Sequence, residues 1–558
     1  MRNIFLLLLL LTFAASTKAQ PIFTKADTLR GSLNDQRDWF DILKYDITVH
    51  PFFETKSIQG NVVWTAKVVK ASNDIQIDLQ VPLIIDSIIY SAINSNQKST
   101  VLSFTRDGNI AMAKLNEHPA INTNFKLNIY YHGVPREAIK PPWDGGWIWK
   151  KDANGKPWMS VACQGLGASV WYPCKDIQSD EPNNGASLTM IVPDSLMAIG
   201  NGRLKTTTKN NGLTTYTWEV TSPINNYTII PYIGDYIGWK EQYPGLKGDL
   251  DIHYWVLRES EEKARAQFTQ VPQMLKAFEY WMGPYPFYED GYQLIQSQHL
   301  GMEHQSAVAY GNKFANGYLG RDLSGTGWGL KWDYIIVHES GHEWFANNIT
   351  TNDIADMWVH EGINSYAETL YTEFYYGKEA GNEYTYGMRK RIRNDIPIIG
   401  KYGVNNEGSG DMYAKGAVML HSIRQAINND SLFRSILIGL NKDFYHQTVS
   451  TQQIENYISN KSNFNFSKTF DQYLRNTQIP IFNYYYDSTE KILTYQYKNC
   501  VVGFNLPINV VYDHTTLSLL PMDYEPKKRL IKMEKFNVKE LAKLIQDKYY
   551  VKLEESKF

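Results

Sequence analysis

The feature of this 558-residue chain that most constrains its fold is an HExxH motif, HESGH, at residues 338–342. On an α-helix the two histidines lie one turn apart on the same face, so His338 and His342 can bind the same metal ion. Glu339 then lies beside the metal, where it can accept a proton from a bound water molecule. The motif therefore predicts a helix, together with a second element that supplies a further ligand.

Glu361 follows His342 after eighteen intervening residues and is the candidate third ligand. A carboxylate often accompanies two histidines in a catalytic zinc site, and the fourth position stays open for water or substrate. This donor set fits Zn²⁺, so we expect one zinc ion per chain, although cobalt or manganese could replace it in vitro. The alternative is a helix that merely has a polar face.

The residues around these positions are more specific than the motif itself. Five blocks stand in order along the chain: CQG to YPCKD at 163–176, GMEH at 301–304, HESGHEWFANNIT at 338–350, DMWVHEG at 356–362 and YAKGA at 413–417. They resemble the zinc aminopeptidase family that contains aminopeptidase N and leukotriene-A hydrolase. The corresponding family patterns are CQA to LPCQD, GxMEN, HExxH with WFGNxVT, LWxNEG and YEKGA. The resemblance extends over roughly residues 40–480.

The resemblance implies roles for residues outside the metal site. Tyr413 matches a tyrosine whose hydroxyl stabilises the oxyanion of the reaction. Glu303 matches a carboxylate that binds a free α-ammonium group, and Gln164 matches a glutamine that contacts the same amino end. Gly301 and Met302 complete the substrate-binding segment. Without the motifs, these side chains could equally be a core tyrosine, a surface acid and a turn residue.

Three of the departures from the family pattern lie next to proposed site residues. Leu300 replaces the first glycine of GxMEN, His304 replaces its asparagine, and His360 replaces the asparagine before the third ligand. We do not expect either histidine to bind the metal, because three ligands already complete a catalytic site that must keep an open position. His304 is expected instead to reshape the contact with the substrate backbone.

Residues 1–19 have the pattern of a secretory signal peptide. A basic start is followed by an apolar run at 4–15 and by small residues before a cleavage site after Ala19. We therefore expect export to the periplasm or the medium, rather than a buried N-terminal helix. No later apolar run reaches the length of about 18 residues that a spanning helix needs, so we expect no membrane anchor.

Cys163 and Cys174 could pair after export, but we expect buried thiols.

The chain is long enough for about three domains, and its pattern changes twice. Residues 20–237 alternate apolar and polar side chains as strands do, for example at 43–50. Residues 238–475 carry helical periodicity, and residues 476–558 return to short strands. We therefore predict an α+β multidomain fold. The resemblance implies an N-terminal antiparallel β saddle, a thermolysin-like α-rich catalytic domain and a small C-terminal β-sandwich.

Together these features predict an exported zinc aminopeptidase that acts, as a monomer, on peptides with a free amino terminus. Glu339 is the expected general base and Tyr413 the expected oxyanion stabiliser. A net charge of −2 does not indicate binding to nucleic acid, which usually requires an excess of basic residues. The alternatives are a zinc endopeptidase, which would have no use for Glu303, an epoxide hydrolase, or a non-catalytic peptide-binding protein on the same fold. The last would have no chemical reason to keep the whole constellation.

Overall fold

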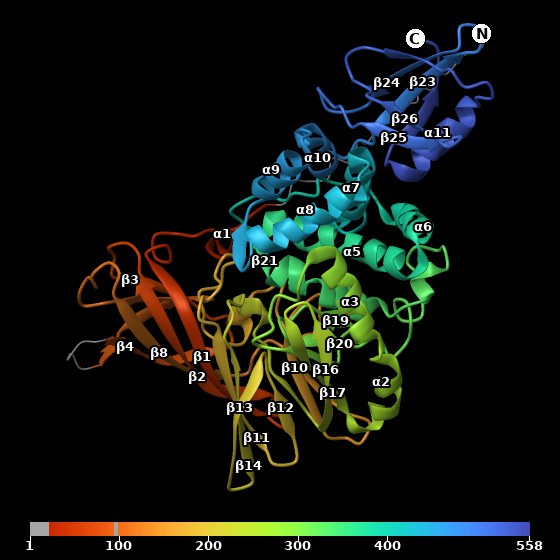
Figure 1. Ribbon diagram of the computed structural model, residues 1–558. Helices are drawn as coiled ribbons and strands as arrows, with labels where there is room; N and C mark the ends of the chain where they lie inside the picture. Colours follow the sequence, from red (N-terminus) through yellow and green to blue (C-terminus); the bar gives the residue numbers. More distant parts are fainter. Residues whose placement is uncertain (1–21, 94–98) are drawn as a thin grey trace, which may run out of the picture.

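The computed structural model describes residues 22–93 and 99–558, so the signal peptide predicted at 1–19 lies outside the described residues. Figure 1 shows the N-terminal strands at the lower left, the helices in the centre and the C-terminal strands at the upper right. The predicted α+β class is confirmed. The three regions follow one another along the chain in the predicted order.

The N-terminal region is built on an eight-stranded sheet. All neighbouring strands are antiparallel except β1 and β11, which run parallel. In spatial order the strands are β13 (Arg203–Asn210), β14 (Leu213–Val220), β11 (Ala186–Pro193), β1 (Phe40–Phe52), β2 (Ser57–Val68), β8 (Asn124–Gly133), β4 (Ile84–Ala92) and β5 (Thr100–Leu102). Two smaller sheets complete the region: β12 (Met197–Ile199), β15 (Tyr232–Gly234), β10 (Pro157–Ala162) and β9 (Gly146–Lys151), then β3 (Asp74–Asp78), β7 (Ile110–Lys114) and β6 (Phe104–Asp107).

The alternation predicted for residues 43–50 is present in β1, with one exception. Tyr45, Ile47 and Val49 are buried, as predicted. Leu43 is only half-buried, because the register of β1 against β2 shifts between Ile42 and Lys44. Such a bulge moves the following side chains to the other face of the strand, which periodicity alone does not reveal.

The central region combines a five-stranded sheet with a helical bundle. In spatial order its strands are β16 (Tyr236–Gly245), β17 (Gly248–Leu257), β18 (Tyr292–Gln296), β20 (Val308–Tyr310) and the edge strand β19 (Gly301–Met302), and β21 (Ile349–Thr351) pairs with β22 (Gln447–Val449) elsewhere. The helices are α2 (Glu261–Gln267), α3 (Gln270–Met282), α4 (Tyr334–Gly341), α5 (Trp358–Tyr376), α6 (Lys378–Met388), α7 (Ala414–Ile427), α8 (Asp430–Asp443), α9 (Thr451–Ser462) and α10 (Ser467–Leu474). The predicted boundary at 237/238 falls inside β16.

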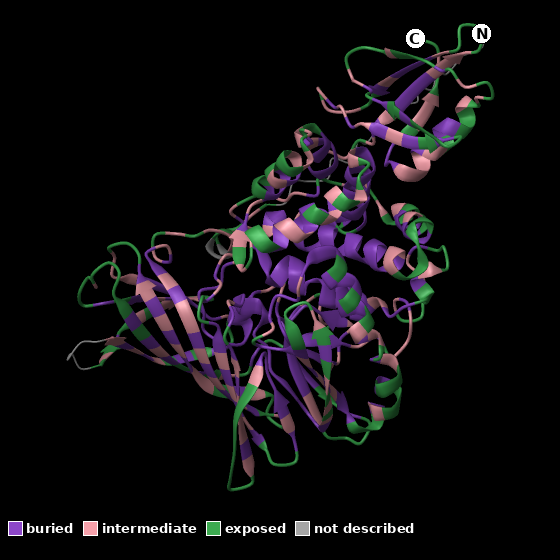
Figure 2. Ribbon diagram, viewed as in Figure 1, coloured by how far each residue is buried: buried purple, intermediate pink, exposed green. Residues whose placement is uncertain are grey.

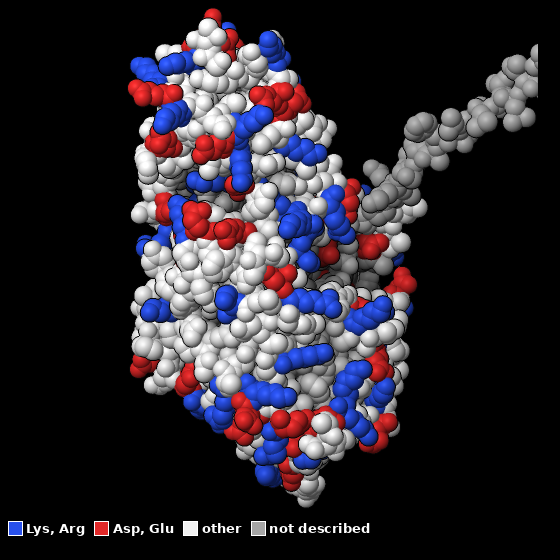
Figure 3. Space-filling view, turned by 90° about the vertical axis from the view of Figure 1, so that its right-hand side faces the viewer, with Lys and Arg blue, Asp and Glu red and all other residues white. Residues whose placement is uncertain are grey.

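Helix α5 lies at the centre of the bundle. Its first fifteen residues are all buried, and α3, α4, α6 and α7 pack against it. Figure 2 shows this buried centre in purple. None of the described helices combines the length and apolar character needed to cross a lipid bilayer. On the face drawn in Figure 3, basic and acidic side chains are interspersed, in keeping with a net charge near zero.

The C-terminal region contains the predicted strands and a helix that was not predicted. A four-stranded sheet of β27 (Lys527–Leu530), β24 (Ile492–Lys498), β23 (Ile481–Asp487) and β28 (Lys552–Glu555) accompanies a hairpin of β25 (Ile508–Tyr512) and β26 (Thr515–Leu519). Helix α11 (Val538–Lys548) begins at the cap Asn537 and buries Leu541, Ala542 and Ile545 on one side. The expectation of a purely β module missed this short amphipathic pattern. A helix α1 (Lys25–Gly31) precedes the saddle.

Helices α5 and α7 meet at two glycines that lie next to the candidate site. A Cβ atom on Gly416 would lie 2.8 Å from the Cα of Gly362, and one on Gly362 would lie 2.9 Å from the carbonyl oxygen of Met412. Neither position has room for a side chain. Because Gly362 follows Glu361 and Gly416 comes three residues after Tyr413, this contact fixes how closely the two candidate site residues approach.

We predict that Gly416→Ala lowers the free energy of unfolding by about 1–3 kcal/mol, because the added methyl group forces α5 and α7 apart. Helix propensity alone would favour alanine by about 1 kcal/mol, so the sign of the change separates the two effects. Chemical denaturation measures it. In the control Gly410→Ala, the new Cβ meets only the end of the Arg393 side chain, at 3.0 Å, so little change is expected. A Gly416→Ala protein as stable as the wild type would contradict this close packing.

Candidate metal centre and active site

Helix α4 carries both histidines of the motif. It begins at Asp333, whose side chain accepts hydrogen bonds from the backbone N–H groups of Ile335 (3.0 Å) and Ile336 (3.3 Å). This is a typical N-cap, because it satisfies donors that a helix start leaves unpaired. The apolar residues that follow are buried, so the helix crosses the interior of the domain. His338 lies inside α4, and His342 lies at its C-terminal end.

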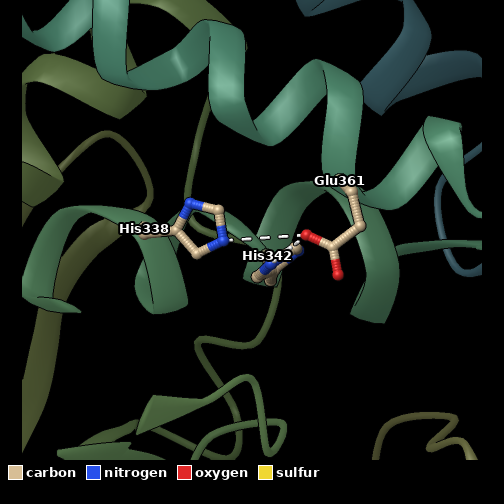
Figure 4. Close-up of side chains that lie close together, drawn as sticks. All are labelled: His338, His342 and Glu361. Carbon is tan, nitrogen blue, oxygen red and sulfur yellow. Dashed lines mark ion pairs between the residues drawn. The ribbon is translucent and has the colours of Figure 1, made fainter. Parts of the chain in front are cut away.

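The structure brings His338, His342 and Glu361 together, as Figure 4 shows. One Glu361 carboxylate oxygen, Oε2, lies 3.6 Å from Nε2 of His338 and 3.3 Å from Nε2 of His342. The three donor atoms all lie within 4.8 Å of one another, and all three side chains are buried. Glu361 belongs to the first turn of α5, so the packing of α4 against α5 creates the cluster.

Each imidazole is oriented by a hydrogen bond at its other nitrogen. Nδ1 of His338 lies 2.8 Å from Oε1 of Glu368, and Nδ1 of His342 lies 3.0 Å from the carbonyl oxygen of Phe345. Both acceptors require a proton on Nδ1, which leaves the Nε2 lone pairs directed at Glu361. The Tyr384 hydroxyl donates to the second oxygen of Glu368 at 2.6 Å.

Glu368 and Tyr384 were not identified from the sequence. The available signal was spacing, since Glu368 comes seven residues after Glu361 and so lies two turns further along the same face of α5. A buried carboxylate on that face has a clear use, because histidine ligands commonly donate their second N–H to such a group.

The chemistry of this cluster fits a divalent cation. Within the described residues, Oε2 of Glu361 is buried and accepts no hydrogen bond. Burial by itself would raise the pKa of Glu361, but the nearby charges of His342 and His338 hold that pKa well below its usual value. A buried carboxylate that faces two imidazole nitrogens is unfavourable unless the imidazoles are protonated or a cation lies between the three groups. Two nitrogens and one oxygen are a donor set that zinc accepts.

The chain leaves helical geometry at Phe345, three residues after His342. Ala346 has φ = 143° and ψ = −49°, a conformation that favours glycine. The family pattern WFGN has glycine at this position, whereas this chain has alanine. This turn directs the carbonyl group of Phe345 toward His342. The strain at Ala346 therefore accompanies the orientation of a metal-site histidine.

Glu339 lies against the edge strand β19. A Cβ atom on Gly301 would lie 2.5 Å from the Oε1 atom of Glu339, so only glycine allows the strand to approach this closely. Burial raises the pKa of Glu339 to about 7, although the charges of His338 and His342 oppose the shift. A carboxyl group with such a pKa can both accept and return a proton near neutral pH.

Glu303 is buried on one side of the metal cluster, and two hydrogen-bond donors hold its carboxylate in place. Gln164 Nε2 donates to its Oε1 at 2.6 Å, and the Tyr227 hydroxyl donates to the same oxygen at 2.9 Å. The Asn347 side chain donates to the Glu303 carbonyl oxygen at 2.8 Å. The structure therefore joins Gln164 to Glu303 and adds Tyr227, which no sequence motif had indicated.

Tyr413 lies at the start of α7. Its ring stacks on the ring of His338, with 6.1 Å between the two centroids. Although Tyr413 is partly exposed, desolvation of its hydroxyl and the nearby charges of Glu361 and Glu407 raise its pKa well above the usual value. The hydroxyl therefore stays protonated and can donate a hydrogen bond. Tyr413 borders a cavity of about 600 Å³. The other predicted site residues also line it: Gln164, Gly301, Met302, Glu303, His338, Glu339, His342 and Glu361.

The two unusual histidines point away from this cavity. Nδ1 of His304 lies 2.5 Å from the Tyr232 hydroxyl, and Nε2 of His360 accepts a hydrogen bond from the Thr351 backbone at 3.0 Å. Burial lowers the pKa of both histidines, to about 3 for His360. Neither belongs to a metal-binding cluster among the described residues. His304 does not line the cavity, so it makes no direct contact with a ligand there, and its expected effect on the substrate backbone stays a prediction.

The cysteines at the start and end of the CQG to YPCKD block are buried thiols, as predicted. The Cys163 thiol donates to the carbonyl oxygen of Tyr227 at 3.2 Å. Burial raises the pKa of Cys174 well above its usual value. Both thiols therefore serve packing near the loop that carries Gln164.

Two family models match this chain. The model of the peptidase family M1 domain matches residues 269–473, and the model of the peptidase M1 N-terminal domain matches residues 42–228. The chain belongs to peptidase family M1. The predicted family is therefore confirmed. The candidate metal centre and most of the saddle fall inside the matched ranges.

Individual relatives are distant. Leukotriene A-4 hydrolase of Xenopus laevis is 22% identical over 333 residues, which are 56% of this chain and 51% of that protein. Aminopeptidase 2, mitochondrial, of Saccharomyces cerevisiae is 20% identical over 468 residues, which are 81% of this chain and 48% of that protein. The chain thus spans about half the length of these curated relatives.

The fold is shared with solved structures of similar size. An M1 zinc metallopeptidase variant from Deinococcus radiodurans, bound to a Tyr-Ser-Ala substrate, aligns with a TM-score of 0.65 at 20% identity. The alignment covers 80% of this chain and 97% of that one. At this identity the similarity establishes the fold.

We predict that Glu368→Ala weakens zinc binding by about 10- to 100-fold, because His338 loses the acceptor that orients it. A competition titration against a chelating dye measures the affinity directly and needs no substrate. Tyr384→Phe removes only the hydroxyl that donates to Glu368 and should weaken binding less. Wild-type affinity in Glu368→Ala would show that this carboxylate has no part in the metal centre.

We also predict that Ala346→Gly raises the free energy of unfolding of the metal-free protein by about 1 kcal/mol, because glycine adopts this backbone conformation without strain. The same substitution at Ala367, which lies inside α5, should instead lower it by about 1 kcal/mol. Both values come from chemical denaturation. Equal losses at the two sites would mean that Ala346 is not strained.

Proposed function

We propose that this protein is an exported, zinc-dependent aminopeptidase that removes the first residue from peptides. The observation that carries the proposal is the position of Glu303. Its carboxylate lies within 4.8 Å of donor atoms of Glu339 and His342, inside the same cavity. A buried carboxylate so close to the metal-binding side chains can pair with an α-ammonium group, which favours cleavage of the first peptide bond. Several relatives bear the name aminopeptidase.

His338, His342 and Glu361 would hold one zinc ion per chain, as family membership implies. When bound there, zinc would acidify a water molecule and polarise the scissile carbonyl group. Glu339 accepts the proton of the water and passes it to the leaving amine. The Tyr413 hydroxyl donates to the oxygen that becomes negatively charged. Gln164 and Tyr227 fix the carboxylate of Glu303, which binds the α-ammonium group of the peptide. The first peptide bond then lies at the metal cluster, beside Glu339 and Tyr413.

Peptides with a free amino terminus are the proposed substrates, and the protein is proposed to work as a monomer. Export to the periplasm or the medium rests on the pattern of residues 1–19 alone. The Deinococcus radiodurans protein binds a Tyr-Ser-Ala peptide, which supports a peptide as the ligand of this fold.

The first prediction from this proposal separates chemistry from metal binding. The wild-type protein should contain close to one zinc ion per chain and lose activity to a chelator. Glu339→Gln should keep the zinc and the fold yet lose most of its turnover, because only the proton acceptor is removed. Tyr413→Phe should lower kcat by about 10²- to 10³-fold with little change in KM.

Elemental analysis and steady-state kinetics check both variants. His342→Ala is the control for ligand loss and should lower the zinc content. Near-normal kcat in Tyr413→Phe would assign the oxyanion role to another group. Zinc loss in Glu339→Gln would place Glu339 among the ligands.

The second prediction concerns the amino end of the substrate. Glu303→Ala should lower kcat/KM by roughly 30- to 1000-fold, because the substrate ammonium loses its partner. Acetylation of the substrate should reduce wild-type kcat/KM similarly, and the two losses should not add, since each removes one partner of the same ion pair. Cleavage of acetylated peptides at internal bonds, at rates near those for peptides with free amino ends, would favour the endopeptidase instead.

A further inference from the structure

Contacts inside the cavity define a direction from one end to the other. At one end, Glu303 lies beside His342. On the far side of the metal cluster, the ring of His338 stacks on Tyr334 with 5.1 Å between centroids. Tyr334 in turn meets Tyr318 edge-on at 5.4 Å. Both tyrosines line the same cavity as Glu303. The order along the cavity is therefore amine anchor, metal cluster, then the two tyrosines.

This order fixes where the rest of a peptide lies. With its ammonium group at Glu303 and its first carbonyl at the metal cluster, the remaining residues extend along Tyr334 and Tyr318. An extended residue spans about 3.5 Å, so the carboxyl terminus of a short peptide comes to lie at the end of the cavity beyond these rings.

Arg391 lines that end of the cavity, and its side chain is exposed to it. Burial raises the pKa of Tyr318, the positive charge of Arg391 opposes that shift, and the charge of Glu339 adds to it. Tyr318 therefore lies within electrostatic reach of both the proposed base and the arginine. The turn Arg389–Arg391 follows α6 directly. Tyr384 of α6 packs on Trp332 with 5.6 Å between ring centroids, and Trp332 stacks on Tyr334 at 6.1 Å. These contacts place Arg391 on the Tyr334 side of the metal cluster, which is the side of the leaving group.

Arg391 has no ion-pair partner among residues 22–93 and 99–558. In the part of the chain that the structure describes, no carboxylate oxygen lies within 4.0 Å of its guanidinium group. A second arginine on the cavity wall, Arg393, differs, because its guanidinium group pairs with Asp395 at 3.4 Å and with Asp411 at 3.9 Å. One arginine at this end is thus paired internally, and the other is available to an anion.

The backbone on either side of Arg391 is fixed. Two residues earlier, the Arg389 guanidinium group donates to the Asp547 carbonyl oxygen in α11 at 3.2 Å. Two residues later, the backbone N–H of Arg393 donates to Asp411 at 2.9 Å. The C-terminal region therefore helps to hold the segment that presents Arg391, which lowers the entropy lost when an anion binds.

We infer that Arg391 binds the C-terminal carboxylate of short peptides and so selects peptide acids of about two to four residues. The inference rests on the proposed function, because it uses the direction in which an aminopeptidase substrate lies. The chemistry is that of a guanidinium group with a carboxylate, which can form two parallel hydrogen bonds. A cavity of about 600 Å³ suits a ligand of this size.

The test compares peptides that differ only at their carboxyl end. Dipeptides, tripeptides and tetrapeptides with the same first residue are supplied as acids and as C-terminal amides, and kcat/KM is measured for release of the first residue. For at least one length the wild-type enzyme should prefer the acid by about tenfold. Arg391→Gln should bring the acid-to-amide ratio close to one, and Arg391→Lys should retain part of the preference.

Arg393→Gln is the matched control and should keep the wild-type ratio, because Arg393 is already paired. Thermal melts confirm that all variants are folded. An acid-to-amide ratio near one at every length in the wild type, or an unchanged ratio in Arg391→Gln, would overturn the inference while leaving the aminopeptidase proposal intact. A wild-type enzyme that releases no first residue from any of these peptides would instead overturn the proposed function.

Discussion

The structure depends on one electrostatic constraint: a buried carboxylate, Glu361, faces the Nε2 atoms of two buried histidines. Without a cation between them, burial of such groups would cost several kcal/mol. The surrounding structure holds them in place nonetheless. Asp333 caps the helix that carries the histidines, and α5 is buried over its first fifteen residues. The glycine contact between α5 and α7 sets the spacing on the other side.

The saddle and the central region line the proposed site, and the C-terminal region supports it from outside. The saddle contributes Gln164 and Tyr227, which orient Glu303 at the amine end. The central region contributes the metal cluster and Tyr413. The C-terminal region binds Arg389 and so supports the segment that carries Arg391 at the other end. A bound peptide would thus contact Glu303 with its ammonium group, the metal cluster with its first carbonyl group and Arg391 with its carboxylate. These contacts need residues that are far apart in the sequence to line one cavity.

The sequence predicted that His338, His342 and Glu361 lie together, and the structure brings them together, because they sit in motifs whose spacing is set by helix geometry. It also predicted the strand alternation in β1, except at the bulge near Leu43. It did not reveal Tyr227 or Glu368, because their contacts join elements that are distant along the chain and their neighbours form no recognisable pattern. Helix α11 was missed for a different reason: its apolar stripe is short and lies among strands.

The central claim is that His338, His342 and Glu361 alone bind one zinc ion and leave a position open. X-ray absorption spectroscopy of the zinc-loaded protein, combined with anomalous diffraction at the zinc edge, tests this most directly. The account predicts a single zinc peak among these side chains, with two nitrogen ligands at about 2.0–2.1 Å, one protein oxygen at about 2.0–2.2 Å and a water molecule. A zinc ion bound by His304 or His360, or one enclosed by four protein ligands, would contradict it.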